Sequence, residues 1–334
     1  MDKNNHLTHQ FACFKLIAIA AFILIFCSPV LVFAQGDGPR FYWKGLSGTN
    51  AIPVIGFSIG GNSNPLDPAH TVVPGSNFDA TMASAGYARI FTLFDRSAMA
   101  SVLVPMGRIS GDVTLNGKAI SQTARGFGDP LMQLDLNLIG PKSMKNIPDV
   151  IRYEPRFSMD VIGSLALPIG KYDDTSPVNI GQNRWYGRIG APILIQVGSW
   201  VPGKKTTVEF LPAVWFFSDN NDFVGETLHT EPMLQLEAHV TRDFMERMWG
   251  SFDFISYTGG QATIGTVEGE KLSNYGAGAT LGYQINDNMQ LTGAYVSSFN
   301  DSGPDDLKMD TFRVSLVFAW HPLIEGMKRL KGKD

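Results

Sequence analysis

Between residues 80 and 320 the chain repeats segments of about ten residues in which apolar and polar side chains alternate, each followed by a turn. The segment 131–138 shows the pattern most clearly, because Gln133, Asp135 and Asn137 alternate with leucine and methionine. In a β-strand, successive side chains point to opposite faces. One such segment also fits a soluble sheet with one wet face, so the argument rests on the many repeats in series.

The alternation predicts eleven strands after residue 79, and a short first strand at 52–59 makes twelve. An even number returns both chain ends to the same side, as bacterial barrels require. The predicted strands after the first are 80–94, 98–110, 128–139, 153–168, 186–197, 206–217, 232–243, 249–258, 272–285, 288–299 and 310–320.

The connections alternate between short turns such as 95–97 and 286–287 and long polar loops such as 111–125, 170–185 and 218–231. Short periplasmic turns and long external loops are typical of outer-membrane barrels. The charged fraction of 17% is below the roughly 25% of a soluble domain. The expected fold class is therefore all-β: a transmembrane, antiparallel, up-and-down β-barrel of about 12 strands, of the bacterial outer-membrane type.

The N-terminus has the features of a signal peptide. Lys3 and Lys15 flank the apolar stretch 16–33, and small residues precede a cleavage site before Gln35. A retained membrane anchor is the alternative. The predicted organisation is a signal peptide at 1–34, an N-terminal segment with the first strand at 35–79, the rest of the barrel at 80–320 and a polar periplasmic tail at 321–334. The predicted localisation is the bacterial outer membrane.

Charge and cysteine content exclude several functions. The chain has 27 basic and 31 acidic residues, and removal of the signal leaves a net charge of about −5. Such mild acidity argues against nucleic acid as a partner. Both cysteines lie in the predicted signal, so the mature chain would form no disulfide and no cysteine-ligated metal site.

The alternation assigns charged side chains to an inner, polar face, since a charge facing lipid at the membrane midplane costs about 2–4 kcal/mol. Aromatic residues near strand ends, including Trp249 and Trp320, are expected at the membrane interfaces. Charges of both signs inside the barrel can brace it or line an aqueous path. The candidate lumen residues are Arg156, Asp160, Glu237, His239 and Arg313, and the other charges placed on the inner face are Arg89, Asp135, Arg188, Glu209 and Asp253.

No catalytic or metal site emerges from the sequence. His239 shares a polar face with Glu237, which could form a general base, but no serine on that strand has a nucleophile signature. The acidic loops at 219–222 and 301–306 could attract calcium, but neither has calcium-loop spacing, and solvated external loops are the favoured interpretation. The glycines around 276–278 lie inside a strand pattern and are not a phosphate loop. We expect no catalytic residues, no metal and no cofactor.

The most specific motif is Leu167-Pro-Ile-Gly-Lys-Tyr-Asp173, followed by Asn179-Ile-Gly-Gln-Asn-Arg-Trp185. It resembles the signature of the outer-membrane family named for the meta-pathway of phenol degradation, and 126–130 resembles an earlier strand entry of that family. The resemblance spans roughly residues 40–320 and implies a barrel associated with uptake of hydrophobic or aromatic compounds. The chain departs from many barrels in its polar tail beyond Trp320.

In physical terms the motif is a strand end followed by an ordered loop, in which Gly170 and Gly181 would permit positive φ. The loop could be purely structural, or it could gate the barrel or bind ligand. The candidate rim residues are Tyr172, Asp173, Asn183, Arg184 and Trp185.

The sequence leads to a passive outer-membrane channel for small hydrophobic or aromatic compounds, by diffusion through the lumen or a lateral opening. The expected partners are outer-membrane lipid, such solutes and, during biogenesis, the barrel-assembly machinery. The alternatives are a structural or adhesive surface barrel with a plugged lumen and an outer-membrane lipid hydrolase.

Overall fold

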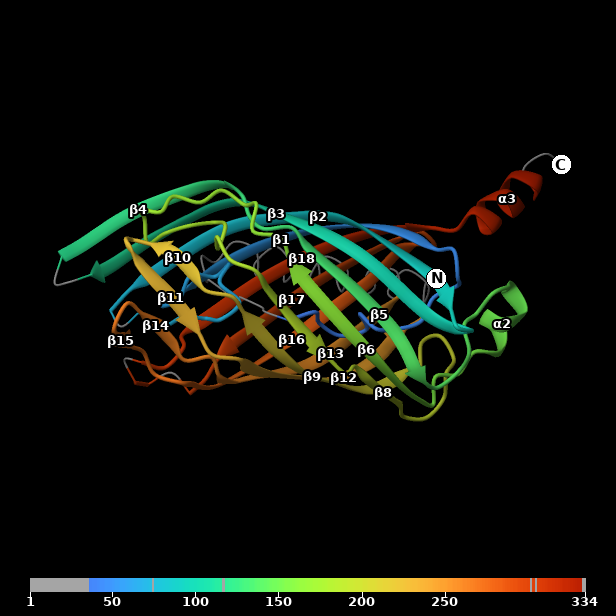
Figure 1. Cartoon of the computed structure of the whole chain (residues 1–334). Helices are drawn as coiled ribbons and strands as arrows, with labels where there is room; N and C mark the ends of the chain where they lie inside the picture. Colours follow the sequence, from blue (N-terminus) through green and yellow to red (C-terminus); the bar gives the residue numbers. More distant parts are fainter. Residues whose placement is uncertain (1–35, 74, 116–117, 301, 304, 332–334) are drawn as a thin grey trace, which may run out of the picture. The chain divides into compact units, whose positions relative to one another are not determined.

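The computed structural model describes residues 36–331 except 74, 116–117, 301 and 304. The predicted signal peptide and its cleavage site lie outside the described residues. The described residues form one compact unit, in which a large antiparallel sheet makes a continuous wall (Figure 1). A separate four-stranded sheet lies among the long loops.

The described elements, in chain order, are β1 (Asn50–Gly61), β2 (Asn77–Leu93), β3 (Arg96–Leu115), β4 (Lys118–Phe127), β5 (Leu131–Ile139), α2 (Ile147–Arg152), β6 (Phe157–Ala166), β7 (Tyr186–Gly190), β8 (Ile193–Gln196), β9 (Thr206–Phe217), β10 (Asn220–Phe223), β11 (Glu226–Thr230), β12 (Met233–Met245), β13 (Met248–Gly259), β14 (Ala262–Ile264), β15 (Val267–Glu268), β16 (Leu272–Asn286), β17 (Met289–Ser298), β18 (Met309–Trp320) and α3 (Pro322–Lys331).

The wall closes because the last strand pairs with the first. β18 runs antiparallel to β1 from Asn50↔Trp320 to Gly61↔Met309, and each wall strand pairs with the next around the ring. β4 with β5, and β7 with β8, each supply one interrupted wall strand, so the closed barrel has 12 strands. This confirms the predicted fold class. The second interruption falls at Pro192, which has no N–H to donate to the ladder.

The two faces of the wall follow the alternation. In β12, the polar residues Gln235, Glu237 and His239 are buried while the apolar residues between them face outward. Exposed apolar side chains cover the outside of the barrel, among them Ile52, Val54, Leu134, Leu165, Phe210, Leu236, Phe252, Leu281 and Phe318. Because lipid takes the place of water around such a belt, these exposed residues are expected in a membrane barrel.

Three placements from the sequence are wrong. Arg89 is exposed near the end of β2, where a long side chain can reach the polar membrane interface. Arg156 precedes β6 at a bend with φ 49°, and its side chain is 84% exposed. Trp249 is 5% exposed and points into the barrel rather than toward the interface.

The two ends of the barrel differ. One end, here called the turn end, carries the short connections and α2; the other, called the loop end, carries the long loops and the sheet of β10, β11, β14 and β15 (Figure 1). The predicted loop at 111–125 is instead mostly a hairpin, because β3 and β4 stay paired from Met106↔Phe127 to Leu115↔Lys118. The predicted polar tail contains helix α3. No described helix is long and apolar enough to cross a membrane.

Candidate functional site: the barrel interior

The interior has two halves of different chemistry. At the loop end, inward-facing residues of the wall and residues of the loops form a buried apolar cluster, called the apolar cluster below. Its members are Ile59, Phe78, Ala80, Met82, Ile109, Val113, Val178, Ile180, Trp215, Met233, Ile255, Tyr257, Leu272, Leu307 and Met309. An apolar core of this kind excludes water from the loop-end half of the lumen.

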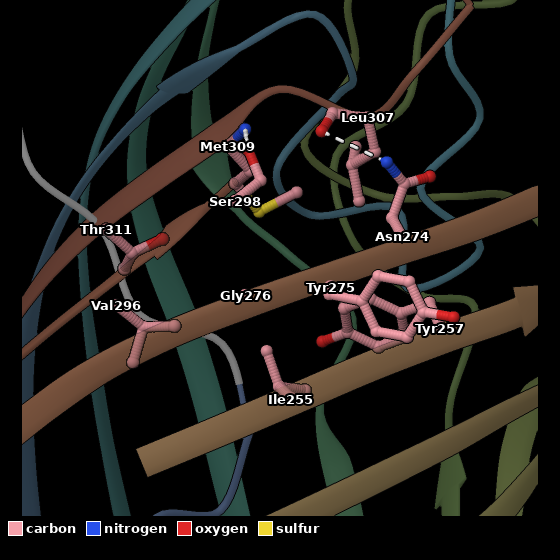
Figure 2. A pocket seen from close by; sticks show the side chains of 10 residues that line it. All are labelled: Ile255, Tyr257, Asn274, Tyr275, Gly276, Val296, Ser298, Leu307, Met309 and Thr311. Atoms are coloured by element: carbon pink, nitrogen blue, oxygen red, sulfur yellow. Dashed lines mark hydrogen bonds between the residues drawn. The ribbon is translucent and has the colours of Figure 1, made fainter. Parts of the chain in front are cut away.

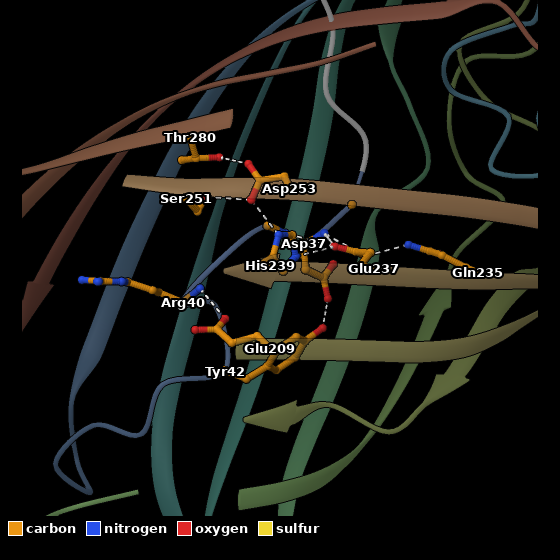
Figure 3. Close-up of polar contacts among 12 residues, drawn as sticks. Asp37, Arg40, Tyr42, Glu209, Gln235, Glu237, His239, Ser251, Asp253 and Thr280 are labelled. Carbon is orange, nitrogen blue, oxygen red and sulfur yellow. Dashed lines mark hydrogen bonds and ion pairs between the residues drawn. The ribbon is translucent and has the colours of Figure 1, made fainter. Parts of the chain in front are cut away.

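The half toward the turn end is lined by buried charges, called the charged network below. Its wall residues are the buried Asp135, Asp160, Arg188, Glu209, Glu237, His239, Asp243 and Asp253, and the half-buried Arg313. Residues 36–49, called the N-terminal segment, run through this half and bond to the wall before β1 begins (Figure 3). Sequence reasoning missed this segment as part of the interior.

The start of the segment lies deepest. The backbone N–H groups of Asp37 and Gly38 donate to Glu237 Oε2 at 3.1 and 3.3 Å. The Asp37 carboxylate forms an ion pair with Arg188, whose Nη1 also lies 3.7 Å from Glu237 Oε1. Arg313 Nη1 donates to the Gly36 carbonyl at 2.8 Å.

Glycine is required on both sides of Asp37. Gly36 has φ +105° and Gly38 has φ +86°, where other residues are strained. A Cβ on Gly38 would lie 2.1 Å from Arg313 Nη2, and one on Gly36 would lie 2.5 Å from Glu237 Oε2. The run Gly36-Asp37-Gly38-Pro39, placed next to the predicted cleavage site, was the available signal in the sequence.

Further along, the segment brings cations to an acidic wall. Arg40 Nη1 pairs with Asp243 Oδ1 at 2.7 Å, and the Arg40 N–H donates to Glu209 Oε2 at 2.8 Å. Lys44 pairs with Asp160 and lies 3.5 Å from Asp135 Oδ1. Because buried charges are costly without partners, these pairs hold the segment in place.

Aromatic rings surround the cations nearest the turn end. The Arg40 guanidinium lies 4.2 Å from the Trp43 ring centre and 4.4 Å from that of Trp249. Lys205 lies over Trp200 at 4.8 Å, and the Trp43 and Trp200 rings are 4.7 Å apart. This arrangement explains why Trp249 faces inward: it covers a buried cation.

Of the candidate lumen residues, Asp160, Glu237, His239 and Arg313 lie together in the charged network, and Arg156 does not. Arg156 pairs with Glu154 at the barrel surface, 3.5 Å apart. The alternation was extended one turn too far, since β6 begins only at Phe157. The described contacts of the inward four are with the wall and the N-terminal segment, an arrangement that braces the barrel.

The serine, histidine and aspartate of this region do not form a nucleophile relay. His239 Nδ1 lies 2.7 Å from Asp253 Oδ1, and Ser251 Oγ donates to the same oxygen at 2.7 Å. The hydroxyl therefore bonds the carboxylate and not the imidazole, whereas a hydrolase needs it on the base. In the described part of the chain, no group of three His, Cys, Asp or Glu residues is placed to hold a metal ion.

The motif loop at 167–185 folds over the loop end. Val178 and Ile180 are both 1% exposed and belong to the apolar cluster. Asp129 holds the loop in place by accepting from the N–H groups of Gly170 and Gln182, each at 2.8 Å. The loop thus contributes part of the barrel's apolar filling.

The expected role of the motif glycines is wrong. Neither Gly170 nor Gly181 has positive φ. Close packing demands them instead, because a Cβ on Gly181 would lie 2.7 Å from the Gly170 carbonyl carbon, and one on Gly170 would lie 2.7 Å from Asp129 Oδ1. Asn183 adopts positive φ, 52°, which asparagine tolerates better than most residues.

The structure places the five candidate rim residues in different surroundings. Tyr172 donates to the Asp222 carbonyl at 2.9 Å, and Asn183 bonds Asn220 at 3.0 Å, so both fasten the motif loop to β10. Asp173 is exposed and accepts from Thr175, which closes a local turn. The remaining two lie on opposite faces of the rim, since Trp185 is 49% exposed and Arg184 is 2% exposed.

Arg184 links two loops and β11. Its Nη2 pairs with Asp67 Oδ1 at 2.8 Å, and its Nη1 donates to Thr230 Oγ1 at 2.7 Å. Burial would raise the pKa of Asp67, but Arg184 and hydrogen bonds from Thr71 and Ala69 outweigh it and hold the pKa below its usual value. Sequence reasoning did not single out Asp67.

His70 lies beside this pair, with its ring 4.5 Å from that of Tyr257. Burial lowers the pKa of His70 to about 4, against the opposing effect of Asp67. At neutral pH the imidazole is therefore uncharged, since burial disfavours its charged form.

Comparison with known proteins accords with this geometry. The family described as "Putative MetA-pathway of phenol degradation" matches residues 61–316. The chain belongs to this family. No relative was found among curated proteins.

Solved structures share the fold. An outer membrane channel from Pseudomonas putida F1 superposes with a TM-score of 0.68 at 16% identity, over 86% of this chain and 100% of that one. The translocator domain of the autotransporter NalP from Neisseria meningitidis gives 0.46 at 12% identity, over 83% and 90%. The first similarity establishes an outer-membrane barrel fold, and the second is too low to add to it.

Proposed function

We propose that this member of the family takes up small apolar molecules, aromatic compounds among them, passively across a bacterial outer membrane. The observation that carries the proposal is the apolar cluster. A barrel built for ions or sugars would line its path with charged or polar groups, whereas the loop-end half of this lumen is filled by buried apolar side chains. The family description agrees with this solute class.

In this proposal the N-terminal segment controls the way out. A solute that enters the apolar cluster meets the charged network and the segment bonded within it. Passage then requires either that the segment moves or that the solute leaves through the wall. No energy source is needed, because an apolar solute moves down its own concentration gradient.

We also propose how the barrel is oriented in the membrane and what surrounds it. The exported chain would lie in the outer membrane with the loop end outside, the exposed apolar belt against lipid, and the barrel-assembly machinery as its partner during insertion. The residues of the motif loop would act by shaping the external mouth rather than by chemistry.

Uptake by cells tests the proposal. A strain with an intact lipopolysaccharide layer is compared with and without the protein, using radiolabelled toluene and, as a hydrophilic control, arabinose. We expect faster toluene entry and unchanged arabinose entry. Equal toluene entry in the two strains, or a gain for arabinose as large as that for toluene, would contradict the proposal.

One observation favours a second function. Both halves of the lumen are filled, which also suits a structural or adhesive surface barrel. That function predicts no change in toluene entry together with altered cell-surface adhesion or envelope integrity in a strain that lacks the protein.

A further inference from the structure

The inside of the loop end leaves little free space. The pocket in Figure 2 lies in the apolar cluster, is lined in part by Ile255, Val296 and Met309, and has a cavity volume of about 30 Å³. A cavity that holds one water molecule needs roughly 10–15 Å³, so this pocket suits water rather than an organic ligand. The outer face of the same end carries a different feature, a pair of exposed arginines.

The outward face of β3 changes from apolar to charged within two residues. Ile109 and Val113 are buried in the apolar cluster, so the even-numbered residues of this strand face outward. Alanine, valine and methionine occupy the outward positions from 100 to 106. The next outward residue is Arg108, which is exposed.

The neighbouring strand β4 changes at the same level. Phe127, at the end of β4, is 58% exposed, and the next outward residue toward the hairpin tip is the exposed Arg125. The register of the hairpin places Arg108 directly opposite Arg125. Side chains that face each other in this way start about 4.5–5.5 Å apart at Cβ, so both guanidinium groups can reach one ligand.

This level is the loop-end border of the apolar belt. Residues 96–108 of β3 span about 40 Å of strand, which covers about 30 Å of membrane depth at a tilt of about 40°. The apolar band of an outer-membrane barrel is about 25 Å tall. Arg108 and Arg125 therefore lie where the acyl chains end and the lipid headgroups begin.

The charge of the pair is not balanced by the protein. In the described part of the chain, neither guanidinium has an ion pair or a hydrogen bond. The outward carboxylates Asp79 and Asp112 lie further from the belt, opposite Ser110 and Ser121. Like charges directly opposite each other destabilise a sheet, so an anion bound between the arginines would remove that repulsion.

We propose that Arg108 and Arg125 together bind a phosphate group of lipopolysaccharide in the outer leaflet of the membrane. Guanidinium groups bind phosphate through two parallel hydrogen bonds, which gives strong and oriented contacts. The phosphates of this lipid lie between its acyl chains and its sugars, at the level of the pair. Its acyl chains then pack on exposed apolar residues of the belt such as Phe127 and Val102. The inference rests on the orientation given under the proposed function, with the loop end outside.

Lipid A with two phosphates, and the same lipid with its phosphates removed, are the probes. Native mass spectrometry of the full-length protein, purified and delipidated in detergent, gives the affinity for each. We expect Arg108→Gln/Arg125→Gln to weaken binding of phosphorylated lipid A about tenfold and to leave binding of the other probe unchanged. Arg108→Lys/Arg125→Lys keeps the charge without the bidentate geometry and should retain part of the affinity.

Two controls accompany the test. Because the glutamine variant removes a pair of like charges, it should unfold at a temperature no lower than the wild type. Arg242 is also exposed, at the turn end of β12, where it donates to Thr206 Oγ1 at 2.7 Å. Arg242→Gln is the matched control and should bind lipid A as the wild type does.

Equal affinity for phosphorylated lipid A in the wild type and the glutamine variant would overturn the inference. An equal loss for the dephosphorylated probe, or in Arg242→Gln, would overturn it too, since binding would then not depend on this pair and its phosphate. Inorganic phosphate that binds the pair as tightly as lipid A would indicate a site for a free anion and not for a lipid.

The proposed function fails separately from this inference. Binding of lipid A that depends on Arg108 and Arg125, in a protein that does not speed toluene entry into cells, would contradict uptake and leave the lipid site standing. Faster toluene entry together with unchanged lipid binding in the glutamine variant would have the opposite meaning.

Discussion

The two halves of the lumen are filled by different kinds of side chain. At the loop end the wall and the motif loop fill the space with apolar side chains, and the filling is held by shape and burial. At the turn end the wall is lined by charges, and the N-terminal segment fills the space by pairing with them. An apolar filling therefore yields to an apolar solute, whereas a charged filling opens only when its ion pairs are exchanged for others or for water.

The largest effect is expected from breaking the charged network. Arg188→Met leaves Asp37 and Glu237 buried without their shared cation. We expect a loss of about 3–5 kcal/mol in the free energy of unfolding and faster hydrogen exchange of the amides in 36–44.

The double variant Arg188→Met/Asp37→Leu is the control, because it removes the carboxylate along with its partner. It should recover part of the lost stability. Wild-type exchange rates at 36–44 in Arg188→Met would show that these charges do not hold the N-terminal segment.

The matching change in the apolar cluster should stay local. Ile109 is 0% exposed, and Ile109→Ala leaves a cavity that costs about 2–5 kcal/mol. The amides in 36–44 should then exchange as in the wild type. If the amides in 36–44 exchange as fast as in Arg188→Met, the two halves form one cooperative unit, which would contradict their separate stabilisation.

Acid should act on the loop end through His70. Its pKa is depressed to about 4 from 6.5, so the unfolded state binds more protons between these values and stability falls as pH drops through that window. The lowered pKa of Asp67 acts in the same direction at lower pH. We expect loss of up to about 3 kcal/mol of local stability in 62–76 between pH 7 and pH 4.

Hydrogen exchange of loop 62–76 at the two pH values measures this loss. His70→Asn, which also tolerates the observed φ of 51°, should flatten the pH dependence between pH 6.5 and pH 4. A dependence that is unchanged in this variant would assign the acid effect to another group.

A smaller effect is expected where the motif loop packs closely. Gly181→Ala places a Cβ 2.7 Å from the Gly170 carbonyl carbon, and such overpacking costs about 1–3 kcal/mol. Gly163→Ala, where a Cβ meets nothing within 4 Å, is the control and should stay within about 0.5 kcal/mol of the wild type. Thermal unfolding of the three proteins in one detergent compares them, and equal midpoints would show that the loop yields without cost.

The wall was predictable from the sequence because a period of two assigns each side chain to a face from local information alone. That reasoning gave the closed barrel and the inward Asp160, Glu237 and His239. It fails where the position of a residue depends on a partner that is far away in the sequence. Trp249 turns inward for Arg40, and the N-terminal segment bonds residues about 200 positions away, such as Glu237.

The motif shows the same limit. Its glycines and Asn183 marked an ordered loop correctly, but the reason for each glycine lies in backbone contacts with Asp129 and between the two glycines themselves. Arg184 was expected at the rim and is instead buried against Asp67. The sequence features that indicate such pairing are the acidic excess of the inner wall and the cations Arg40 and Lys44, which lie outside every predicted strand.

The N-terminal segment closes the turn-end half of the lumen by bonding to its charged wall. Thr241 lies on that wall, is 0% exposed and accepts a hydrogen bond from Arg40 Nε at 3.1 Å. The most direct test is the rate at which a water-soluble thiol reagent labels Thr241→Cys in the otherwise full chain and in a variant that also lacks residues 36–44. We expect slow labelling in the full chain and much faster labelling in the variant, because water would then reach the wall from the turn end. Equal labelling rates in two correctly folded proteins would contradict closure by the segment.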